Sequence, residues 1–446
     1  MAKQRLVVLG GGESGIGSAV LGKVKGLDVF LSDNGQIKPD FKKTLEQFDI
    51  PFEECGHTKS AILNADEVVK SPGIPEDNPL VLLIKENRIP IISEIEFAGR
   101  YDTAKKICIT GSNGKTTTTS LIYYMLKNAG LNVGLAGNIG KSYAYQVATE
   151  KFDYYVIELS SFQLDGMYKF KADIAILMNI TPDHLDRYEF QMQNYVNAKF
   201  RITQNLTKKE CFVFCADDPI TAKELDKIVL TAKKLPFTQK DKVEQGAFID
   251  EDKLYVRYED DEYSMYMKEL ALPGKHNLYN QMAAAIAAKV VDIDNKVIRE
   301  SLMSFQGVEH RLEKVLTVKS VLYVNDSKAT NVDAAWYALD SMTTPVVWIA
   351  GGKDKGNDYS QLYELVKNKV RVLICMGLHN EKLHQCFADK VDKIIDVTSA
   401  KDAVAVAYKY AKPGDTVLLS PCCASFDLFK NYEDRGEQFK QAVKEL

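Results

Sequence analysis

Residues 109–120, which read ITGSNGKTTTTS, form a turn suited to holding phosphate. Glycines let backbone N–H groups point at phosphate oxygens, and the start of a helix adds a partial positive charge. Lys115 can then reach the terminal phosphates, and the Thr116 hydroxyl can bind Mg²⁺. The match is a shortened P-loop, G-x-x-G-K-T, because Ile109 stands where a full P-loop has a small residue. The order of strand, loop, Lys-Thr and helix favours this interpretation over a plain turn.

A second glycine turn lies near the N-terminus, where residues 10–15 read GGGESG and satisfy G-x-G-x-x-G. Asp33 follows about twenty residues later, at the end of the next apolar run, where an acid can bond a ribose hydroxyl. The pattern indicates a bound nucleotide diphosphate. A dinucleotide and a purely structural turn stay open as alternatives.

Acidic residues and a histidine follow the apolar runs of the middle of the chain. Glu158 ends one such run, where a carboxylate can hold Mg²⁺ beside a P-loop. His184 lies among carboxylates in TPDHLD (181–186), and a histidine ligand would indicate tolerance of Mn²⁺. On the residues alone, a single loop histidine is more often a hydrogen-bonding group, and Lys199 is typical of a solvated helix face.

Length and composition limit the class of protein. The 446 residues are too many for one core, and 46% apolar and 26% charged residues are typical of a soluble globular chain. The net charge of −4 argues against nucleic-acid binding. No stretch is long and apolar enough to span a membrane, and the N-terminus lacks the features of a signal peptide. We therefore expect a cytoplasmic protein that does not insert into membranes.

The eight cysteines show none of the paired spacings of a zinc site. Cys108, Cys211 and Cys375 lie in apolar, strand-like runs. We expect reduced thiols, several of them buried, in a reducing compartment.

Alternation of apolar strand-like runs with helical segments predicts an α/β protein of three domains. Residues 1–100 are expected to form an N-terminal Rossmann-like domain. Residues 101–307 are expected to form a P-loop ATPase-type domain with a mostly parallel sheet, in which the alternating pattern of 246–267 predicts a small antiparallel insert. Residues 308–446 are expected to form a C-terminal Rossmann-like domain. Four strand-like runs there end in loops that hold Lys328, Lys355 and Ser425, which suit a small dicarboxylate.

Over essentially its whole length the chain resembles the Mur ligases of peptidoglycan synthesis. The phosphate turn and the HN and HR pairs mark the wider superfamily, whereas NDSKATN (325–331) and SPCCASFD (420–427) point to its D-glutamate-adding branch. The stretches that carry the resemblance also include SPGIP (71–75), TGSNGKTTT (110–118), GNIG (137–140), ELSSFQL (158–164), NITPDHLDRY (179–188), AKFRI (198–202), GKHNLYN (274–280), EHRLE (309–313) and GGKDKG (351–356).

The resemblance implies an ATP-dependent ligase with two small-molecule substrates, UDP-N-acetylmuramoyl-L-alanine and D-glutamate. ATP would phosphorylate the alanyl carboxylate, and the amine of D-glutamate would displace phosphate from the acyl phosphate. A close alternative is another ligase of the superfamily, similar to folylpolyglutamate synthases. An alternative from another class is a dinucleotide-binding regulatory protein.

The resemblance also implies roles for individual residues. Lys115, His184 and Lys199 would be catalytic, with Lys199 carrying a carbamate formed from CO₂. Two Mg²⁺ ions, replaceable by Mn²⁺, would be held by Thr116, Glu158, His184 and carbamylated Lys199. ATP would be bound by Gly111, Ser112, Asn113, Gly114, Lys115, Thr116, Thr117, Asn277, Asn280, Arg311, Asp326 and Lys328. The UDP-sugar would be bound by Gly12, Ser14, Gly15, Asp33, Asn34, Ser71, Pro72, Gly73, Asn138, Ser161 and Gln163. D-Glutamate would be bound by Thr330, Lys355, Ser425, Phe426 and Tyr432, and the enzyme is expected to be a monomer.

The chain departs from the family pattern at three positions. Cys215 stands where an asparagine is expected, and Cys423 follows Cys422 in SPCCASFD. Lys353 accompanies Lys355 in GGKDKG, so either lysine is a candidate for the glutamate carboxylate.

Overall fold

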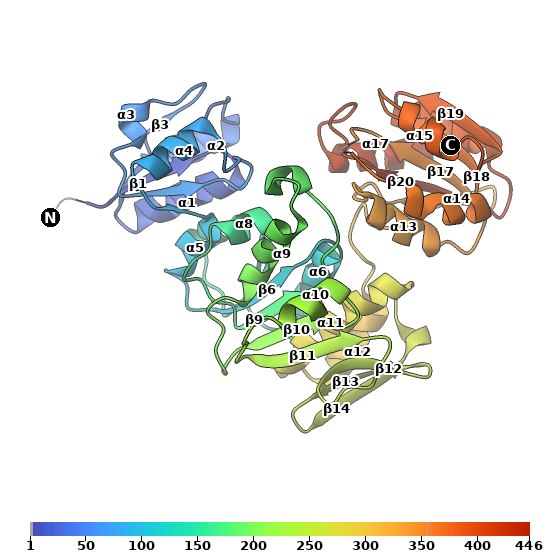
Figure 1. Cartoon of the computed structure of the whole chain (residues 1–446), viewed down its shortest axis with the longest axis horizontal. Helices are drawn as coiled ribbons and strands as arrows, with labels where there is room; N and C mark the ends of the chain where they lie inside the picture. The colour runs from blue at the N-terminus through green and yellow to red at the C-terminus, as the bar shows by residue number, and fades with distance from the viewer. Residues whose placement is uncertain (1–2, 355) are drawn as a thin grey trace. The chain divides into compact units, whose positions relative to one another are not determined.

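The computed structural model describes residues 3–354 and 356–446 and contains three α/β domains, each built around its own sheet (Figure 1). The chain divides into two compact units. The first holds the first two sheets and comprises Met1–Ala271 and Tyr279–Phe305; the second holds the third sheet and comprises Leu272–Leu278 and Gln306–Leu446. The expected fold class is confirmed, while the expected domain boundaries stay a prediction.

The first sheet is parallel, with strand order β3-β2-β1-β4-β5. Successive side chains of a strand point to opposite faces of the sheet. Leu6 and Val8 therefore pack in the same core as helix α1, whereas Val7 and Leu9 pack with α3 and α4 on the other face. The elements are β1 (Arg5–Leu9), α1 (Glu13–Val24), β2 (Asp28–Ser32), α2 (Pro39–Gln47), β3 (Phe52–Glu53), α3 (Lys59–Ile62), β4 (Glu67–Lys70), α4 (Pro79–Glu86), β5 (Ile91–Ile92) and α5 (Glu94–Gly99).

The second sheet has nine strands in the order β14-β13-β12-β11-β10-β9-β6-β8-β7. Strands β6 to β12 pair in parallel, while β12, β13 and β14 pair antiparallel, so the expected insert is confirmed and extends the same sheet. The strands are β6 (Lys105–Thr110), β7 (Val133–Gly137), β8 (Tyr154–Glu158), β9 (Ile174–Leu177), β10 (Cys211–Cys215), β11 (Lys233–Thr238), β12 (Gly246–Asp250), β13 (Lys253–Tyr258) and β14 (Asp261–Tyr266). The helices are α6 (Lys115–Asn128), α7 (Tyr143–Thr149), α8 (Ser161–Asp165), η1 (Leu185–Tyr188), α9 (Met192–Phe200), η2 (Arg201–Thr203), α10 (Pro219–Leu225), η3 (Met267–Glu269), α11 (Lys275–Val290) and α12 (Asn295–Ser304).

The third sheet has six strands in the order β15-β16-β20-β17-β18-β19. Only four of these were evident from the sequence, since β15 and β19 are half-exposed edge strands without continuous apolar runs. Helices α13, α14 and α15 pack on one face, and α16 and α17 on the other. The elements are β15 (Glu313–Val318), β16 (Val321–Asn325), α13 (Val332–Asp340), β17 (Val346–Gly351), η4 (Ser360–Leu362), α14 (Tyr363–Lys369), β18 (Val370–Met376), α15 (Glu381–Phe387), β19 (Lys393–Val397), α16 (Ala400–Tyr410), β20 (Thr416–Cys422) and α17 (Tyr432–Lys444).

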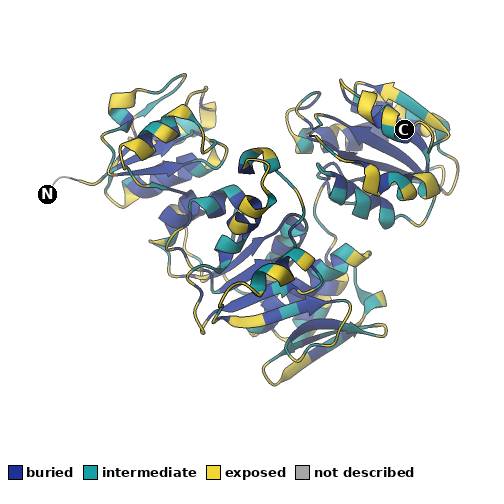
Figure 2. Cartoon of the chain, in the orientation of Figure 1, coloured by how far each residue is buried: buried dark blue, intermediate teal, exposed yellow. Residues whose placement is uncertain are grey.

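Burial explains why the central strands read as uninterrupted apolar runs. Every residue of β17 and of β20 is buried, because helices cover both faces of a parallel sheet. Figure 2 shows the same pattern in each sheet, with exposed residues concentrated on helices and loops.

The structure also tests the expectations of reduced cysteines and of no membrane-spanning helix. All eight cysteines are free thiols, and Cys108, Cys211 and Cys375 are buried as expected. In the part of the chain that the structure describes, no helix combines the length and apolar character needed to cross a bilayer.

The first glycine turn depends on close backbone approach at Gly15. A Cβ added there would lie 1.8 Å from the Gly10 carbonyl oxygen, whereas a Cβ at Gly12 meets nothing within 4 Å. We expect Gly15→Ala to lower the free energy of unfolding of the first unit by about 1–3 kcal/mol, because the turn and helix α1 must separate.

Gly12→Ala is the matched control, since it adds the same methyl group to the same turn. Urea unfolding followed by far-UV circular dichroism measures both variants. Equal midpoints for the two would contradict the proposed role of Gly15.

Candidate functional site

The second glycine turn joins β6 to α6 and wraps around its own lysine. Gly111 (φ 147°) and Gly114 (φ 85°) have backbone conformations that residues with a Cβ rarely adopt. The Lys115 Nζ donates to the carbonyl oxygens of Gly111 at 2.7 Å and Ser112 at 2.9 Å. Thr116 and Thr117 are buried in the first turn of α6. The turn is thus preformed, with its cation held inside it.

The segment that follows β9 braces this turn, because β6 and β9 are neighbouring parallel strands. The Asn113 N–H donates to Asn179 Oδ1 at 2.8 Å, and the Ser112 hydroxyl donates to the Thr181 carbonyl at 2.8 Å. Asn280 lies against the turn from α11, since a Cβ on Gly114 would come within 2.3 Å of its Oδ1.

Glu158 supplies a carboxylate at the end of β8, on the other side of β6. Its side chain is 1% exposed, and Oε1 accepts a hydrogen bond from Asn138 Nδ2 at 2.9 Å. In the described part of the chain, Oε2 is buried and has no hydrogen-bond partner. A buried, unpaired carboxylate oxygen is costly, and a bound cation would balance it. The residues therefore fit the divalent metal on which the phosphate turn would depend.

Lys199 lies on α9 and is only 2% exposed, so the solvated-face interpretation is wrong. Its Nζ donates to the Gly111 carbonyl at 2.9 Å and to Thr110 Oγ1 at 3.3 Å, and it lies 5.2 Å from the centre of the Tyr195 ring. Burial, and next the positive charge of Lys115, lower the pKa of Lys199 well below its ordinary value. Burial therefore favours the neutral form of this amine over the charged form.

The two lysines share an acceptor, because the Gly111 carbonyl oxygen receives hydrogen bonds from both Lys115 and Lys199. The carboxylates of Asp183 and Glu158 lie close enough to favour the charged form of Lys199, but they do not offset its burial. Glu158, Lys115 and Lys199 therefore lie in one electrostatically coupled cluster at the carboxyl edge of the second sheet.

His184 immediately precedes the short helix η1 and has a left-handed backbone conformation (φ 52°). Its Nε2 lies 3.5 Å from Asp183 Oδ2, and its ring packs edge-on against Phe162 at 5.2 Å between centroids. Two residues predicted to meet the sugar lie nearby on α8. Ser161 is buried, and Gln163 Oε1 accepts from the Ser160 N–H at 2.9 Å, so Gln163 caps its own helix.

Asp33 braces the N-terminal turn. Its Oδ2 accepts from the Gly11 N–H at 2.5 Å, and its Oδ1 accepts from the Gly35 N–H at 2.6 Å. Gly12 caps α1, with Ser14 and buried Gly15 in the first turn of that helix, and Asn34 is exposed beside Asp33. The carboxylate thus fixes the shape of the turn, a role that the sequence pattern did not reveal.

Ser71 faces the same turn from the loop after β4. Its hydroxyl is buried, has no hydrogen-bond partner among the described residues, and lies 2.5 Å from where a Cβ on Gly10 would be. The Pro72 carbonyl accepts from Arg187 Nη2 at 3.4 Å, and a Cβ added at Gly73 would meet nothing within 4 Å. The structure therefore brings the GGGESG and SPG segments together.

In the second unit, the loops after β16 and β20 lie side by side. Asp326 accepts from Ser420 Oγ at 2.9 Å, and Arg311 Nη1 lies 3.9 Å away. Burial, only partly offset by Arg311, raises the pKa of Asp326 to about 6. Lys328 Nζ donates to the Tyr432 hydroxyl at 3.2 Å. Thr330 follows Lys328 by two residues in the same loop.

Other predicted residues of this unit are less closely gathered. Ser425 is buried, while Phe426 is 68% exposed. Asn277 Nδ2 donates to the Pro273 carbonyl at 2.8 Å. Lys355 lies outside the described residues, whereas the Lys353 N–H donates to the Ala424 carbonyl at 2.8 Å.

Arg435 is a site residue that the sequence reasoning missed. It is 1% exposed and donates to the carbonyl oxygens of Ser327 at 2.8 Å and Cys423 at 3.2 Å, which ties the loop after β16 to the loop after β20. The available signal was its spacing, since Arg435 precedes Phe439 and Val443 by four and eight residues and so lies on the buried stripe of α17.

Three protein-family models match the chain. They are described as MurD N-terminal domain (residues 6–79), Mur ligase middle domain (residues 109–288) and Mur ligase, glutamate ligase domain (residues 310–423). In solved structures the same fold occurs in UDP-N-acetylmuramate-alanine ligase from Thermotoga maritima, with a TM-score of 0.62, 18% identity and 99% of each chain covered. A pseudomurein peptide ligase type C from Methanothermus fervidus gives a TM-score of 0.61 at 22% identity, again over 99% of each chain.

Curated relatives narrow the class further. A UDP-N-acetylmuramoylalanine--D-glutamate ligase from Bacteroides fragilis is 61% identical over 99% of this chain and 100% of its own length. One of the same name from Christiangramia forsetii is 53% identical over 99% of this chain and 100% of its own length. The chain belongs to the Mur ligases, in their UDP-N-acetylmuramoylalanine--D-glutamate ligase family. The folate-type ligase and the dinucleotide-binding regulator are therefore not favoured.

Replacement of Gly114 tests the phosphate turn. We expect Gly114→Ala to weaken ATP binding about tenfold or more, because the left-handed backbone is strained and the new methyl group meets Asn280. Isothermal titration calorimetry with a non-hydrolysable ATP analogue measures the change.

Gly130→Ala is the matched control, since Gly130 also has a left-handed backbone (φ 75°), at the other end of α6, but has nothing within 4 Å of a Cβ. It should lose stability with unchanged nucleotide affinity. If both variants bind the analogue as the wild-type protein does, the turn is not the nucleotide site.

Proposed function

We propose that this chain joins D-glutamate to UDP-N-acetylmuramoyl-L-alanine at the expense of ATP, the activity that its relatives' names state. The observation that carries the proposal is the cluster at the end of β6 and β8. A preformed phosphate turn, a buried carboxylate with one unpaired oxygen and a buried amine with a lowered pKa meet there. This combination suits transfer of a phosphoryl group between two anions, which requires neutralisation and positioning more than covalent catalysis.

The turn would hold the ATP phosphates through residues 111–117. The N–H groups at the start of α6 and the Lys115 ammonium would face the transferred phosphoryl group, and Lys115 would exchange its two carbonyl contacts for phosphate oxygens. Mg²⁺, held by Thr116 and Glu158, would supply the charge neutralisation that the phosphates need. A carboxylate is a poor electrophile, and phosphorylation gives it a leaving group that the incoming amine can displace.

Lys199 is proposed to carry a carbamate. Its neutral amine would attack the carbon of CO₂ and form an N–C bond. The electron pair of one C–O π bond would move onto its oxygen, and one proton would leave the nitrogen for water. The lowered pKa supports the first step, since only the neutral amine is nucleophilic. The product would replace a neutral group by an anion, which with His184 suits a second divalent ion, Mg²⁺ or Mn²⁺.

The second unit is proposed to supply the amino-acid site. Lys328 and Tyr432 are in contact, and Thr330 and Ser425 lie in the loops that Arg435 ties together. Lys355 and Phe426 stay in this proposal, with Lys353 as the alternative lysine. Asp326, Arg311, Asn277 and Asn280 are proposed to orient ATP.

The N-terminal turn is proposed to bind the UDP end of the sugar substrate. Gly12, Ser14 and Gly15 lie at the start of α1, where N–H groups favour a diphosphate. Asn34, exposed beside Asp33, and the Ser71–Gly73 segment are proposed to meet the same ligand, with Asn138, Ser161 and Gln163 toward the sugar. A cytoplasmic location and a monomeric state belong to the proposal, because ATP and nucleotide sugars are cytoplasmic substrates and one chain contains every proposed group.

Substrate replacement tests the activity. Purified protein should release phosphate from MgATP only when UDP-N-acetylmuramoyl-L-alanine and D-glutamate are both present, because the acyl phosphate needs both an acid and an amine. L-Glutamate in place of D-glutamate, or a folate in place of the UDP-sugar, should leave phosphate release at background. Release with L-glutamate and folate instead would contradict the assignment, and ¹⁸O from the labelled carboxylate should appear in the phosphate.

Lys199 is tested by spectroscopy as well as by rate. Protein equilibrated with ¹³CO₂ should show one carbamate carbon signal by NMR, which Lys199→Ala should lack while losing about a hundredfold or more of kcat. Short carboxylates should partly restore the rate of this variant.

Lys106→Arg is the matched control, since Lys106 is also a buried lysine of the second sheet's domain. It should keep both the signal and the rate. A carbamate signal that persists in Lys199→Ala, or full activity of that variant, would remove Lys199 from the mechanism.

A further inference from the structure

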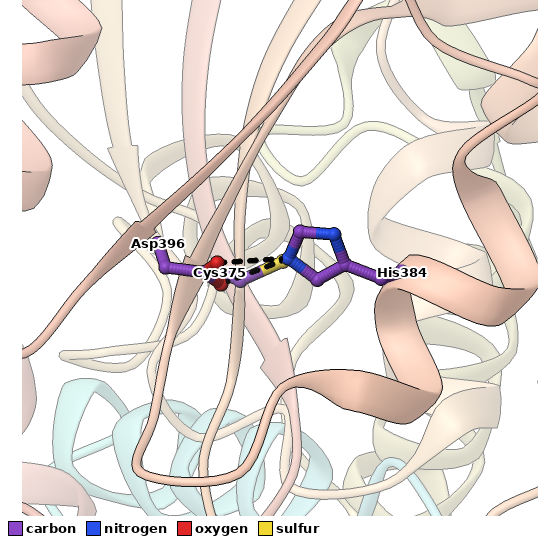
Figure 3. A group of neighbouring side chains, drawn as sticks. All are labelled: Cys375, His384 and Asp396. Carbon is purple, nitrogen blue, oxygen red and sulfur yellow. Dashed lines mark hydrogen bonds and ion pairs between the residues drawn. The ribbon is translucent and has the colours of Figure 1, made fainter.

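Three side chains with metal-binding atoms converge in the third sheet, and none of them is assigned a role above. They are Cys375 on β18, His384 on α15 and Asp396 on β19, and one ligand atom of each lies within 4.8 Å of the other two (Figure 3). The parallel register pairs Cys375 directly with Asp396, so both project from the same face of the sheet. α15 follows the loop after β18 and presents His384 to that face.

Hydrogen bonds in the structure already orient His384 and Asp396. His384 Nε2 lies 2.9 Å and 3.0 Å from the two Asp396 oxygens. The Asn380 amide group donates to Asp396 Oδ1 at 3.0 Å, as hydrogen-bond donors around metal-ligating carboxylates do. Cys375 is fully buried at the base, whereas His384 and Asp396 are partly exposed and can adjust.

A cavity of about 680 Å³ opens beside these residues and is lined by His384 and Asp396 themselves. Glu381 and Asp402 add two further acids to its wall, and His384 is its one basic-type side chain among the described lining residues. The field in the cavity therefore favours a cation, and a ligand atom or water there can reach the same point as the three side chains.

We propose that Cys375, His384 and Asp396 form a binding site for a Zn²⁺-like transition-metal ion. Sulfur, imidazole nitrogen and one carboxylate oxygen are borderline-soft ligands that select zinc or cobalt over Mg²⁺. Ligand atoms around a tetrahedral zinc lie roughly 3–4 Å apart, so movement of the exposed side chains by roughly an ångström completes the set. On binding, the Cys375 S–H bond breaks, its proton passes to solvent and a sulfur–metal bond forms, without oxidation or reduction. The fourth position faces the cavity.

The spacing rules for zinc sites did not reveal this set, since its ligands are separated by nine and twelve residues and include a single cysteine. The three side chains are close because the sheet register pairs Cys375 with Asp396 and because α15 packs back against that face of the sheet with His384. The site lies in a different sheet from the phosphate turn, and its ligand chemistry separates it from the proposed Mg²⁺ site.

Cobalt titration of the full-length protein in excess Mg²⁺ tests the proposal. Wild-type protein should take up one equivalent of Co²⁺ with a thiolate-to-cobalt charge-transfer band, and Zn²⁺ should displace it. Cys375→Ser should abolish the band, and His384→Gln, a change at a half-exposed position, should raise the Kd for Co²⁺ about a hundredfold.

Cys386→Ser is the matched control, because Cys386 also lies on α15 but outside the set. It should keep both the band and the affinity. The assignment would be overturned if wild-type protein showed no charge-transfer band, or if Cys375→Ser kept the band. It would also be overturned if His384→Gln bound Co²⁺ as tightly as wild-type protein, or if Cys386→Ser lost the band. Because the readout is metal binding, it is independent of whether the ligase activity is found.

Discussion

The proposed catalytic cluster depends on one carbonyl oxygen, that of Gly111, which accepts hydrogen bonds from both Lys115 and Lys199. Two ammonium groups on one buried oxygen would repel each other with little water to screen them. The structure eases this conflict by burying Lys199, which lowers its pKa and favours the neutral form of that amine. The charge of the phosphate turn and the nucleophilicity of the second lysine are therefore two results of the same constraint.

The strand order of the second sheet makes this arrangement possible. β6 lies between β8 and β9, so the turn after β6 has Glu158 on one side and the braced Asn179–Thr181 segment on the other. α9 then returns to place Lys199 behind the turn. Glu158 is the last residue of β8 and Asn179 lies two residues after the end of β9, so the neighbouring strands fix where these groups lie. A parallel sheet thus gathers groups from distant parts of the sequence without a long flexible loop.

The sequence predicted well those features that depend on local pattern. The α/β class, the antiparallel insert at residues 246–267 and the two glycine turns follow from hydrophobic period and glycine spacing, and the structure contains each of them. Side-chain burial was harder to predict. Lys199 resembled a surface lysine because one residue's type says nothing of what packs over it, and only the family resemblance indicated otherwise.

Contacts between distant segments were also beyond the sequence. Arg435 bridges the loop at Ser327, 108 residues earlier in the chain, and the loop at Cys423, and its role became visible only with the fold. Asp33 was expected at a ribose hydroxyl because the fingerprint places an acid there. The pattern records the position of that acid, not which partners its oxygens find, and backbone N–H groups occupy both of them.

The bracing by Asp33 has a consequence for inhibitor design. If the N-terminal turn recognises its ligand through main-chain N–H groups, a compound that binds those groups depends on no side chain that a single substitution could remove. A bacterium could change the turn only by replacing Asp33 or the glycines, and such a change would disturb the folded shape that the natural substrate also requires. Resistance by point mutation would then carry a cost in growth, which makes this small turn an attractive anchoring point for antibacterial compounds.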